Sequence, residues 1–138
     1  MPEDCIFCQI IAGDAKGYIV DEDEYTMTFM DAFPVVPGHT LIVTKNHYDN
    51  ILDADAEAIA AVGRRSTSIA KAIKSALQPE GLGVFQLNGA AAGQTVFHYH
   101  MHLIPRNDGE QLEIHSRIPG APEDLAAMAA RIKEAIEP

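Results

Sequence analysis

The sequence predicts an α+β fold with a mainly antiparallel sheet. Three observations carry this prediction: strand-like segments follow one another at hairpin-like spacing, helical patterns are inserted between them, and no G-x-G-x-x-G motif follows a strand, which disfavours a Rossmann arrangement. With 138 residues, of which 47% are hydrophobic, the chain is long enough for one ordinary domain with its own core. We therefore expect a single domain over residues 1–138.

Five segments have the β-branched and aromatic composition of strands and are bounded by turn residues. They cover residues 18–20, 25–30, 39–44, 82–87 and 96–104. The acidic turn Asp21–Glu24 predicts that the first two segments form a hairpin. Pro105 is expected to end the last strand because proline has no N–H for the ladder. Residues 88–95, rich in Gly and Ala, are expected to form the loop before that strand.

Apolar residues at helical spacing indicate three helices. The first is short and covers residues 6–12, and the second is a long central helix that runs from Asp53 or Asp55, as its N-cap, to about Leu77. Pro122 opens the C-terminal helix. Its apolar stripe is formed by Leu125, Met128, Ile132 and Ile136.

The last predicted strand contains three histidines that alternate with apolar residues. Successive side chains of a strand point to opposite faces, so His98, His100 and His102 are expected on one face. Because histidine is scarce and titrates near neutrality, a functional site is a better interpretation than a solvent-exposed row. The apolar residues on the other face, Tyr99, Met101 and Leu103, are expected to face the core. His115 stands alone among polar residues and is expected to be a solvated surface side chain.

The residue pattern alone allows two uses of the three imidazoles. They either bind a metal ion together or divide into a nucleophile and its helpers. Joint metal binding is the weaker interpretation, because residues two apart along a strand are separated by roughly 6 to 7 Å.

The only two cysteines, Cys5 and Cys8, form a C-x-x-C pair in the first helix. Two cysteines are too few for a disulfide-stapled secreted fold, so the pair is either half of a metal site or a redox pair. We favour metal binding, because no strand precedes the motif as it does in a thioredoxin-like unit. With two histidines, the cysteines would complete a closed, structural Cys2His2 zinc site.

The formal net charge of −10 argues against general nucleic-acid binding, which requires Lys and Arg to displace counterions from phosphates. An anionic ligand must then be held by local amides, hydroxyls and imidazoles. No apolar run approaches the roughly 20 residues that span a bilayer. The start, Met1–Asp4, is acidic where a secretory signal is basic. We therefore expect a cytoplasmic protein without a membrane partner.

Several motifs together resemble the histidine triad (HIT) family of nucleotide hydrolases and transferases. Residues 98–104 match the family signature His-φ-His-φ-His-φ-φ in full, and further agreement lies in Cys5–Gly13, Asp31–Thr40, Lys45–His47 and Asn88–Thr95. The chain looks closest to the bacterial Hint-like branch that keeps a C-x-x-C zinc site. The resemblance covers a core of residues 5–106, implies a HIT fold with about five antiparallel strands, and leaves residues 107–138 as a C-terminal extension.

The resemblance implies a covalent mechanism. It makes His100 the nucleophile that attacks an α-phosphate, His102 a residue that bonds phosphate oxygens or helps to protonate the leaving group, and His39 a supporting histidine. A neutral imidazole suits the first role, since it is a good nucleophile near neutral pH. The nucleotide-binding residues implied are Asp31, for the ribose hydroxyls, and Asn88, Gly93, Gln94 and Thr95, with His100 and His102, for the phosphate.

The resemblance also implies a structural zinc ion and a homodimer. The implied zinc ligands are Cys5, Cys8, His47 and His98. The implied activity releases a nucleoside monophosphate from a purine nucleoside phosphoramidate or a related nucleotide. Two alternatives stay open: a zinc-stabilised purine-nucleotide-binding module without significant turnover, and a dinucleoside polyphosphate hydrolase.

Overall fold

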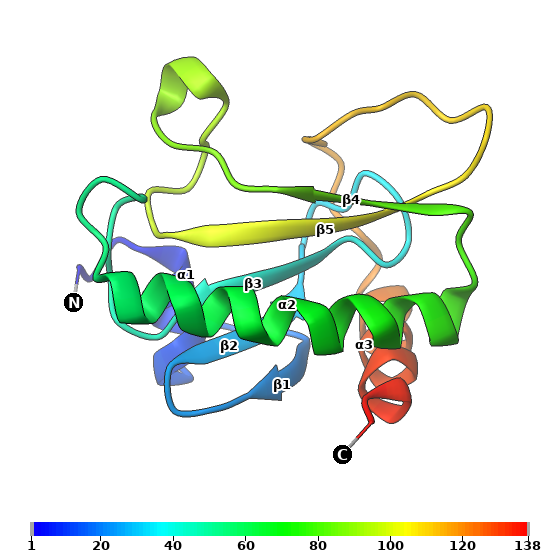
Figure 1. Cartoon of the computed structure of the whole chain (residues 1–138), viewed down its shortest axis with the longest axis horizontal. Helices are drawn as coiled ribbons and strands as arrows, with labels where there is room; N and C mark the ends of the chain where they lie inside the picture. The colour runs from blue at the N-terminus through cyan, green and yellow to red at the C-terminus, as the bar shows by residue number, and fades with distance from the viewer. Residues whose placement is uncertain (1, 138) are drawn as a thin grey trace.

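The computed structural model describes residues 2–137, and within them a single five-stranded antiparallel sheet is combined with three α-helices (Figure 1). The helices are α1 (Ile6–Ala12), α2 (Ala56–Leu77) and α3 (Pro122–Ala135). The strands are β1 (Ile19–Glu22), β2 (Thr26–Met30), β3 (Thr40–Thr44), β4 (Gly81–Phe85) and β5 (His100–Arg106), and a 3-10 turn, η1, spans Ala90–Ala92. The α+β prediction, with its long central helix and its C-terminal helix, is confirmed.

The strand order places the histidine strand inside the sheet. The order is β1-β2-β3-β5-β4, so β5 is paired on both sides. On the β3 side His100 lies opposite Val43 and His102 lies opposite Leu41. On the β4 side His102 lies opposite Phe85. Two ladders therefore fix the backbone from which these imidazoles project.

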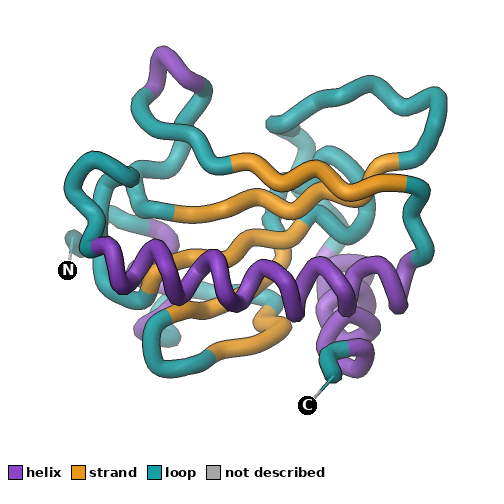
Figure 2. Tube along the Cα trace, in the orientation of Figure 1, coloured by secondary structure: helices purple, strands orange, loops and turns teal. Residues whose placement is uncertain are grey.

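Different helices cover the two faces of the sheet: in Figure 2 α2 crosses in front of the strands and α1 lies behind them. Helix α3 shares the core cluster of α2. The α2 face buries Ile42, Tyr99 and Leu103 against Val62, Ile69 and Ile73 of α2 and against Leu125 and Ile132 of α3. The α1 face buries Phe7 and Cys8 against Met27, Phe29, Leu41 and Val43. Alternation puts Leu103 of β5, with Tyr99 just before the strand, in the first core and turns His100 and His102 to the second face, as predicted.

The helix starts match the sequence closely. Asp55 occupies the N-cap of α2, while the carboxylate of Asp53, the other predicted cap, accepts from the N–H groups of Asp49 and Asn50 and closes the preceding turn. Pro122 opens α3, whose buried residues include Ala129. Since α3 packs into the same core cluster as the sheet, the segment expected as an extension forms part of the core.

The limits of the last strand were predicted incorrectly. The expected strand 96–104 is instead β5 (His100–Arg106), because the chain before it follows the 44–48 segment: the Tyr99 N–H donates to the Tyr48 carbonyl at 2.7 Å. Pro105 lies within β5 and does not end it. Pairing with β3 stops at Leu103, so Pro105 has only the β4 neighbour, which is the edge situation in which a strand tolerates proline. The other strand limits differ from prediction by at most two residues.

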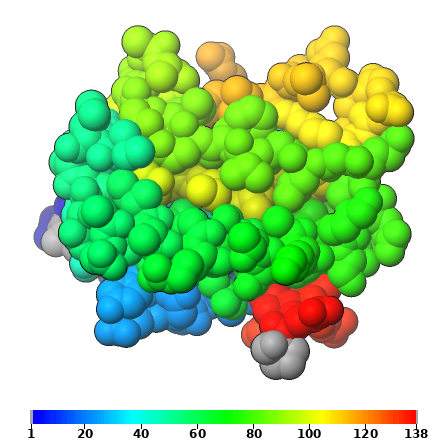
Figure 3. Space-filling model, viewed as in Figure 1, coloured from blue at the N-terminus to red at the C-terminus, as the bar shows by residue number. Residues whose placement is uncertain are grey.

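A long connection, residues 107–121, joins β5 to α3. In Figure 3 its first part (gold) projects at the upper right, across the top of the molecule from the loop that carries η1. Buried Arg106 holds it from below by donating to the carbonyls of Gln111 and Glu113. Of the helices in residues 2–137, none is both long enough and apolar enough to cross a membrane.

Candidate active site

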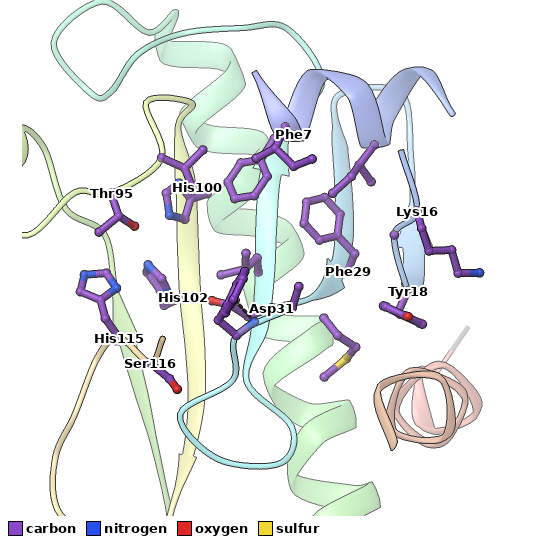
Figure 4. Close-up of a pocket in the computed structure, with 18 of the residues that line it drawn as sticks. Phe7, Lys16, Tyr18, Phe29, Asp31, Thr95, His100, His102, His115 and Ser116 are labelled. Atoms are coloured by element: carbon purple, nitrogen blue, oxygen red, sulfur yellow. Dashed lines mark hydrogen bonds between the residues drawn. The ribbon is translucent and has the colours of Figure 1, made fainter. Parts of the chain in front are cut away.

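A cavity of about 390 Å³ opens on the α1 face of the sheet (Figure 4). Its apolar wall includes Ile6, Phe7, Ile10, Phe29 and Leu41. Its polar groups include Asp31, Thr95, His100, His102, His115 and Ser116. An apolar wall beside convergent polar groups suits a ligand with a flat apolar part and a charged part.

His100 is held in one orientation and one protonation pattern. Its Nδ1 lies 2.6 Å from the His98 carbonyl oxygen. A carbonyl can only accept, so Nδ1 carries the proton and Nε2 keeps its lone pair. The Phe7 ring packs edge-on against the imidazole with ring centroids 5.0 Å apart. His100 therefore offers the cavity an unprotonated ring nitrogen.

His39 and His102 form a directed chain of hydrogen bonds. The Val35 N–H donates to His39 Nδ1 at 3.2 Å, so the proton of His39 is on Nε2. His39 Nε2 then donates to His102 Nδ1 at 2.9 Å. The proton of His102 is consequently on Nε2, the nitrogen that remains for a ligand. His102 thus offers the cavity an N–H donor, whereas His100 offers it a lone pair.

Burial keeps these imidazoles neutral. It lowers the pKa of His39 and that of His102 to about 3, with the positive charge of Arg106 adding to the effect on His39. Burial likewise lowers the pKa of His100. Because His39 is neutral, its 3.4 Å contact with the Asp31 carboxylate is not an ion pair. The hydrogen bonds of His100 and of the His39–His102 pair, as assigned above, require these neutral forms.

Asp31 serves the turn after β2 and the cavity together. Its Oδ1 accepts from the Phe33 N–H at 2.8 Å, while the carboxylate lines the cavity. Burial raises the pKa of Asp31. Asp31 therefore stabilises the turn after β2 and also presents a carboxylate to the cavity.

The loop before β5 is fixed by two amide side chains that point away from the cavity. Gln94 is buried, accepts from the Gly89 N–H at 2.7 Å and donates to the Asp49 carbonyl at 2.6 Å. Asn88 accepts from the Ile51 N–H at 2.8 Å. Only Thr95 of the four predicted loop residues lines the cavity. The two amides thus shape the loop.

A second cluster lies behind the cavity, at the start of α1. The possible ligand atoms of Cys5, Cys8, His47 and His98 all lie within 4.8 Å of one another. His98 Nδ1 is 3.3 Å from Cys5 Sγ and 3.5 Å from Cys8 Sγ, and His47 Nδ1 is 3.3 Å from Cys8 Sγ. Ligand atoms of a tetrahedral zinc ion lie about 3.4–3.8 Å apart, given Zn–S of about 2.3 Å and Zn–N of about 2.0–2.1 Å. The four residues fit such an ion.

The outer contacts of this cluster point both imidazoles inward. His98 Nε2 donates to the Thr44 carbonyl at 2.6 Å, and His47 Nε2 donates to the Asp49 carboxylate at 3.1 Å. Each Nδ1 therefore keeps its lone pair for a metal, the arrangement of histidine ligands in zinc sites. Burial raises the pKa of the Cys8 thiol to about 11, so metal binding would release a proton there.

Comparison with known proteins identifies the family. The family model for the HIT domain matches residues 12–109. The chain belongs to the HIT family. It is 45% identical to the protein hit of Bacillus subtilis over 104 residues, 75% of this chain and 72% of that protein. It is 35% identical to an adenylylsulfatase of Arabidopsis thaliana over 112 residues, 81% of this chain and 57% of the relative.

Solved HIT structures have the same fold. A Hit-like protein from Bartonella henselae superposes with a TM-score of 0.91, at 39% identity and with 98% of both chains covered. A zinc-bound HIT family protein from Mycobacterium smegmatis superposes with a TM-score of 0.79 at 34% identity, covering 96% of this chain and 97% of the other. HIT proteins are in general nucleotide-binding proteins and hydrolases.

The three histidines of the HIT triad do not gather at one point as metal ligands would. Within residues 2–137 the groups of close ligand atoms are the Cys5 cluster and the trio Asp31, His39 and His102, so His98, His100 and His102 do not form one. His98 precedes β5 and turns into the cysteine cluster, although sequence alternation placed it beside the other two. The interpretation as a three-histidine metal hydrolase is therefore wrong.

One histidine of this HIT protein has a position that the sequence did not indicate. His115 is exposed, as expected, but it also lines the cavity, and its ring centroid lies 5.9 Å from that of His102. Ser116 and Arg117 line the cavity with it. No local pattern marks these residues, because a connection without periodicity brings them there.

Proposed function

We propose that this protein is a nucleotide hydrolase or nucleotidyl transferase that acts on purine nucleoside phosphoramidates, or related nucleotides, through a nucleotidyl-His100 intermediate. The observation that carries the proposal is the proton pattern at β5: His100 Nδ1 donates to the His98 carbonyl, which leaves Nε2 as the nucleophile. The burial that lowers the pKa of His100 supports the same assignment, since a protonated imidazole cannot attack phosphorus.

The reaction divides into two displacements at the α-phosphorus. His100 Nε2 attacks first, the bond to the leaving group breaks, and the nucleotide is transferred to the imidazole. Because His39 donates to His102 Nδ1, the proton of His102 is on Nε2. From there it can be donated to a non-bridging phosphate oxygen, whose negative charge grows in the transition state. Water attacks the same phosphorus next, which releases the nucleoside monophosphate and restores His100.

The cavity supports an orientation for the nucleotide. Phe7 and Phe29, whose rings are 5.4 Å apart, provide an apolar wall for the base. Asp31 Oδ2 is the carboxylate oxygen left for the ribose hydroxyls, because Oδ1 accepts from Phe33. Thr95 would meet the phosphate through its hydroxyl group, whereas the Gly93 N–H already donates to the Ala90 carbonyl. Hydroxyl and imidazole N–H donors allow the strongly acidic chain to hold the phosphate without a dense cationic patch.

We further propose that Cys5, Cys8, His47 and His98 hold a zinc ion, which when bound supplies a structural cross-link between α1 and the catalytic strand. With four protein ligands no position stays open for substrate. The zinc-bound relative from Mycobacterium smegmatis supports zinc as the metal. Metal analysis of natively purified protein tests the proposal, and full activity without zinc contradicts it.

The covalent intermediate provides the decisive test. Intact-mass measurement after mixing with adenosine 5′-phosphoramidate should detect a nucleotidyl adduct in the wild type and in His102→Ala, but not in His100→Ala. Because a binding module needs the cavity and not the nucleophile, binding without adduct or monophosphate release would favour that alternative.

The leaving group distinguishes the other candidates. Release of AMP from a phosphoramidate faster than from a dinucleoside polyphosphate supports the phosphoramidase, and the reverse order supports the polyphosphate hydrolase. An adenylylsulfate arm belongs in the same assay, because the Arabidopsis relative is an adenylylsulfatase. We propose a cytoplasmic location and no nucleic-acid or membrane partner, in line with the net charge of −10.

A further inference from the structure

His115 brings a third imidazole to the cavity, beside His100 and His102, from outside the HIT signature. Its Nε2 donates to the Gly93 carbonyl at 2.6 Å, which fixes the ring and leaves Nδ1 for a second partner. Figure 4 shows His115 beside Thr95 and His102, at the end of the cavity away from Phe29. It therefore lies at the phosphate end and not at the apolar end.

The connection that carries His115 is anchored on both sides of it. Buried Arg106 donates to the carbonyls of Gln111 and Glu113, ahead of His115. After it, the Gly120 N–H donates to the Ala32 carbonyl at 2.9 Å. These bonds, with the one to Gly93, hold the imidazole over the cavity although the segment has little apolar burial of its own: Leu112 is 79% exposed.

The proton that an amine leaving group needs is not supplied by the buried histidines. His102 is neutral, since burial lowers its pKa to about 3, and its one N–H is suited to a phosphate oxygen. His39 is buried behind His102 and has no access to the cavity mouth. His115 alone among the imidazoles lining the cavity is exposed, so it can take up a proton from solvent.

We propose that His115 is a further catalytic residue, the general acid that protonates the leaving group as the nucleotide transfers to His100. This inference rests on the proposed function. The lone pair of His100 Nε2 forms the new P–N bond, the P–N bond to the amine breaks, and its electron pair takes the proton from His115 Nδ1, so a neutral amine leaves. In the second step water attacks phosphorus, its proton passes to His115, and the bond to His100 breaks with the electron pair returning to Nε2.

The test compares two substrates that differ only in the leaving group. An adenosine 5′-phosphoramidate of an alkylamine needs a proton to leave, whereas adenosine 5′-phosphofluoridate does not. His115→Gln keeps a donor for the Gly93 carbonyl but cannot transfer a proton. It should lower kcat/KM for the alkylamine substrate by about 10²- to 10⁴-fold and that for the fluoridate by less than about tenfold. Added imidazole should restore part of the alkylamine rate in His115→Ala.

The control is Leu112→Ala, an exposed residue of the same connection, which should leave both rates unchanged. Melting temperature and zinc content report whether the His115 variants keep the fold. An equal loss on both substrates, or no loss on either, overturns the general-acid assignment. Absence of a nucleotidyl adduct from both substrates in the wild type overturns the proposed function, and with it this inference.

Discussion

His98 connects the cysteine cluster to His100: its Nδ1 lies 3.3 Å from Cys5 Sγ, and its carbonyl accepts from His100 Nδ1 at 2.6 Å. A metal that fixes His98 also fixes the carbonyl that orients His100. The orientation of His100, the proposed nucleophile, is therefore coupled to the cysteine cluster, although that cluster lies outside the cavity lining.

Weakening an outer contact of the cluster should lower metal affinity without removing a ligand. Asp49 accepts from His47 Nε2, so Asp49→Asn should reduce zinc affinity by about 10- to 100-fold. Competition for zinc between the protein and a coloured chelator, monitored by absorbance, measures the zinc affinity. Glu57→Gln, which removes the same charge from the first turn of α2, is the control and should bind zinc like the wild type. Equal affinity in Asp49→Asn would contradict a metal at these four residues.

Loss of His39 should lower the rate of the reaction, because the proton of His102 is then no longer fixed on Nε2. Without the Nε2 donor of His39, His102 can place its proton on either nitrogen, so His39→Ala should lower kcat by roughly 10- to 100-fold, less than the loss of a proton-transferring group. His39→Gln can accept from Val35 and donate to His102, and it should recover part of the rate. Steady-state kinetics measure both. If neither variant changes kcat, the hydrogen-bond chain has no catalytic role.

Stability should fall in mild acid. The folded pKa of His39 and of His102 is about 3, below the ordinary value of about 6.5, so between these values the unfolded chain binds more protons. Their contribution is complete above about pH 6.5 and is lost as the pH falls toward 3, with a slope of up to about 1.4 kcal/mol per pH unit for each histidine.

Asp31 opposes this trend, because its raised pKa gives stability that is present at low pH and lost as the pH rises. Urea unfolding at pH 7 and pH 5 measures the sum of these contributions. His39→Gln should show a shallower loss than the wild type, and identical free energies at the two pH values in the wild type would contradict the buried neutral pair.

Arg106 should control the order of the 107–121 connection. Arg106→Ala removes donors to two carbonyls and should destabilise the protein by about 1.5–3 kcal/mol. Hydrogen exchange of amides in residues 111–118 should accelerate more than that of α2. Arg64→Ala, on the exposed side of α2, is the control. Unchanged exchange in Arg106→Ala would show that other contacts hold the connection.

A homodimer is expected to form across α2 and the edge of the sheet. β4 is an edge strand of the chain, and Val84 on it is 51% exposed, which leaves an unpaired apolar edge. Light scattering should give a dimeric mass for the wild type and a monomeric one for Val84→Lys. Leu52→Lys, at an exposed loop position, should stay dimeric. A monomeric wild type would contradict the expectation.

The sequence by itself determined the elements and most of the candidate site residues, because these depend on local patterns. The period of two along 98–104 separated imidazoles from core residues, and helical spacing located α2 and α3. The resemblance to the HIT family then suggested the roles of His100 and His102 and a zinc site that includes Cys5 and Cys8.

Only the tertiary structure decided the proton patterns, the departure of His98 from β5 and the place of His115. The proton on His102 is set by His39, 63 residues earlier, and His115 is positioned by a carbonyl 22 residues before it. Pro105 stays within its strand only because β3 ends before it. Each of these features depends on a neighbour distant in the chain, and no periodicity of the local sequence records such a neighbour.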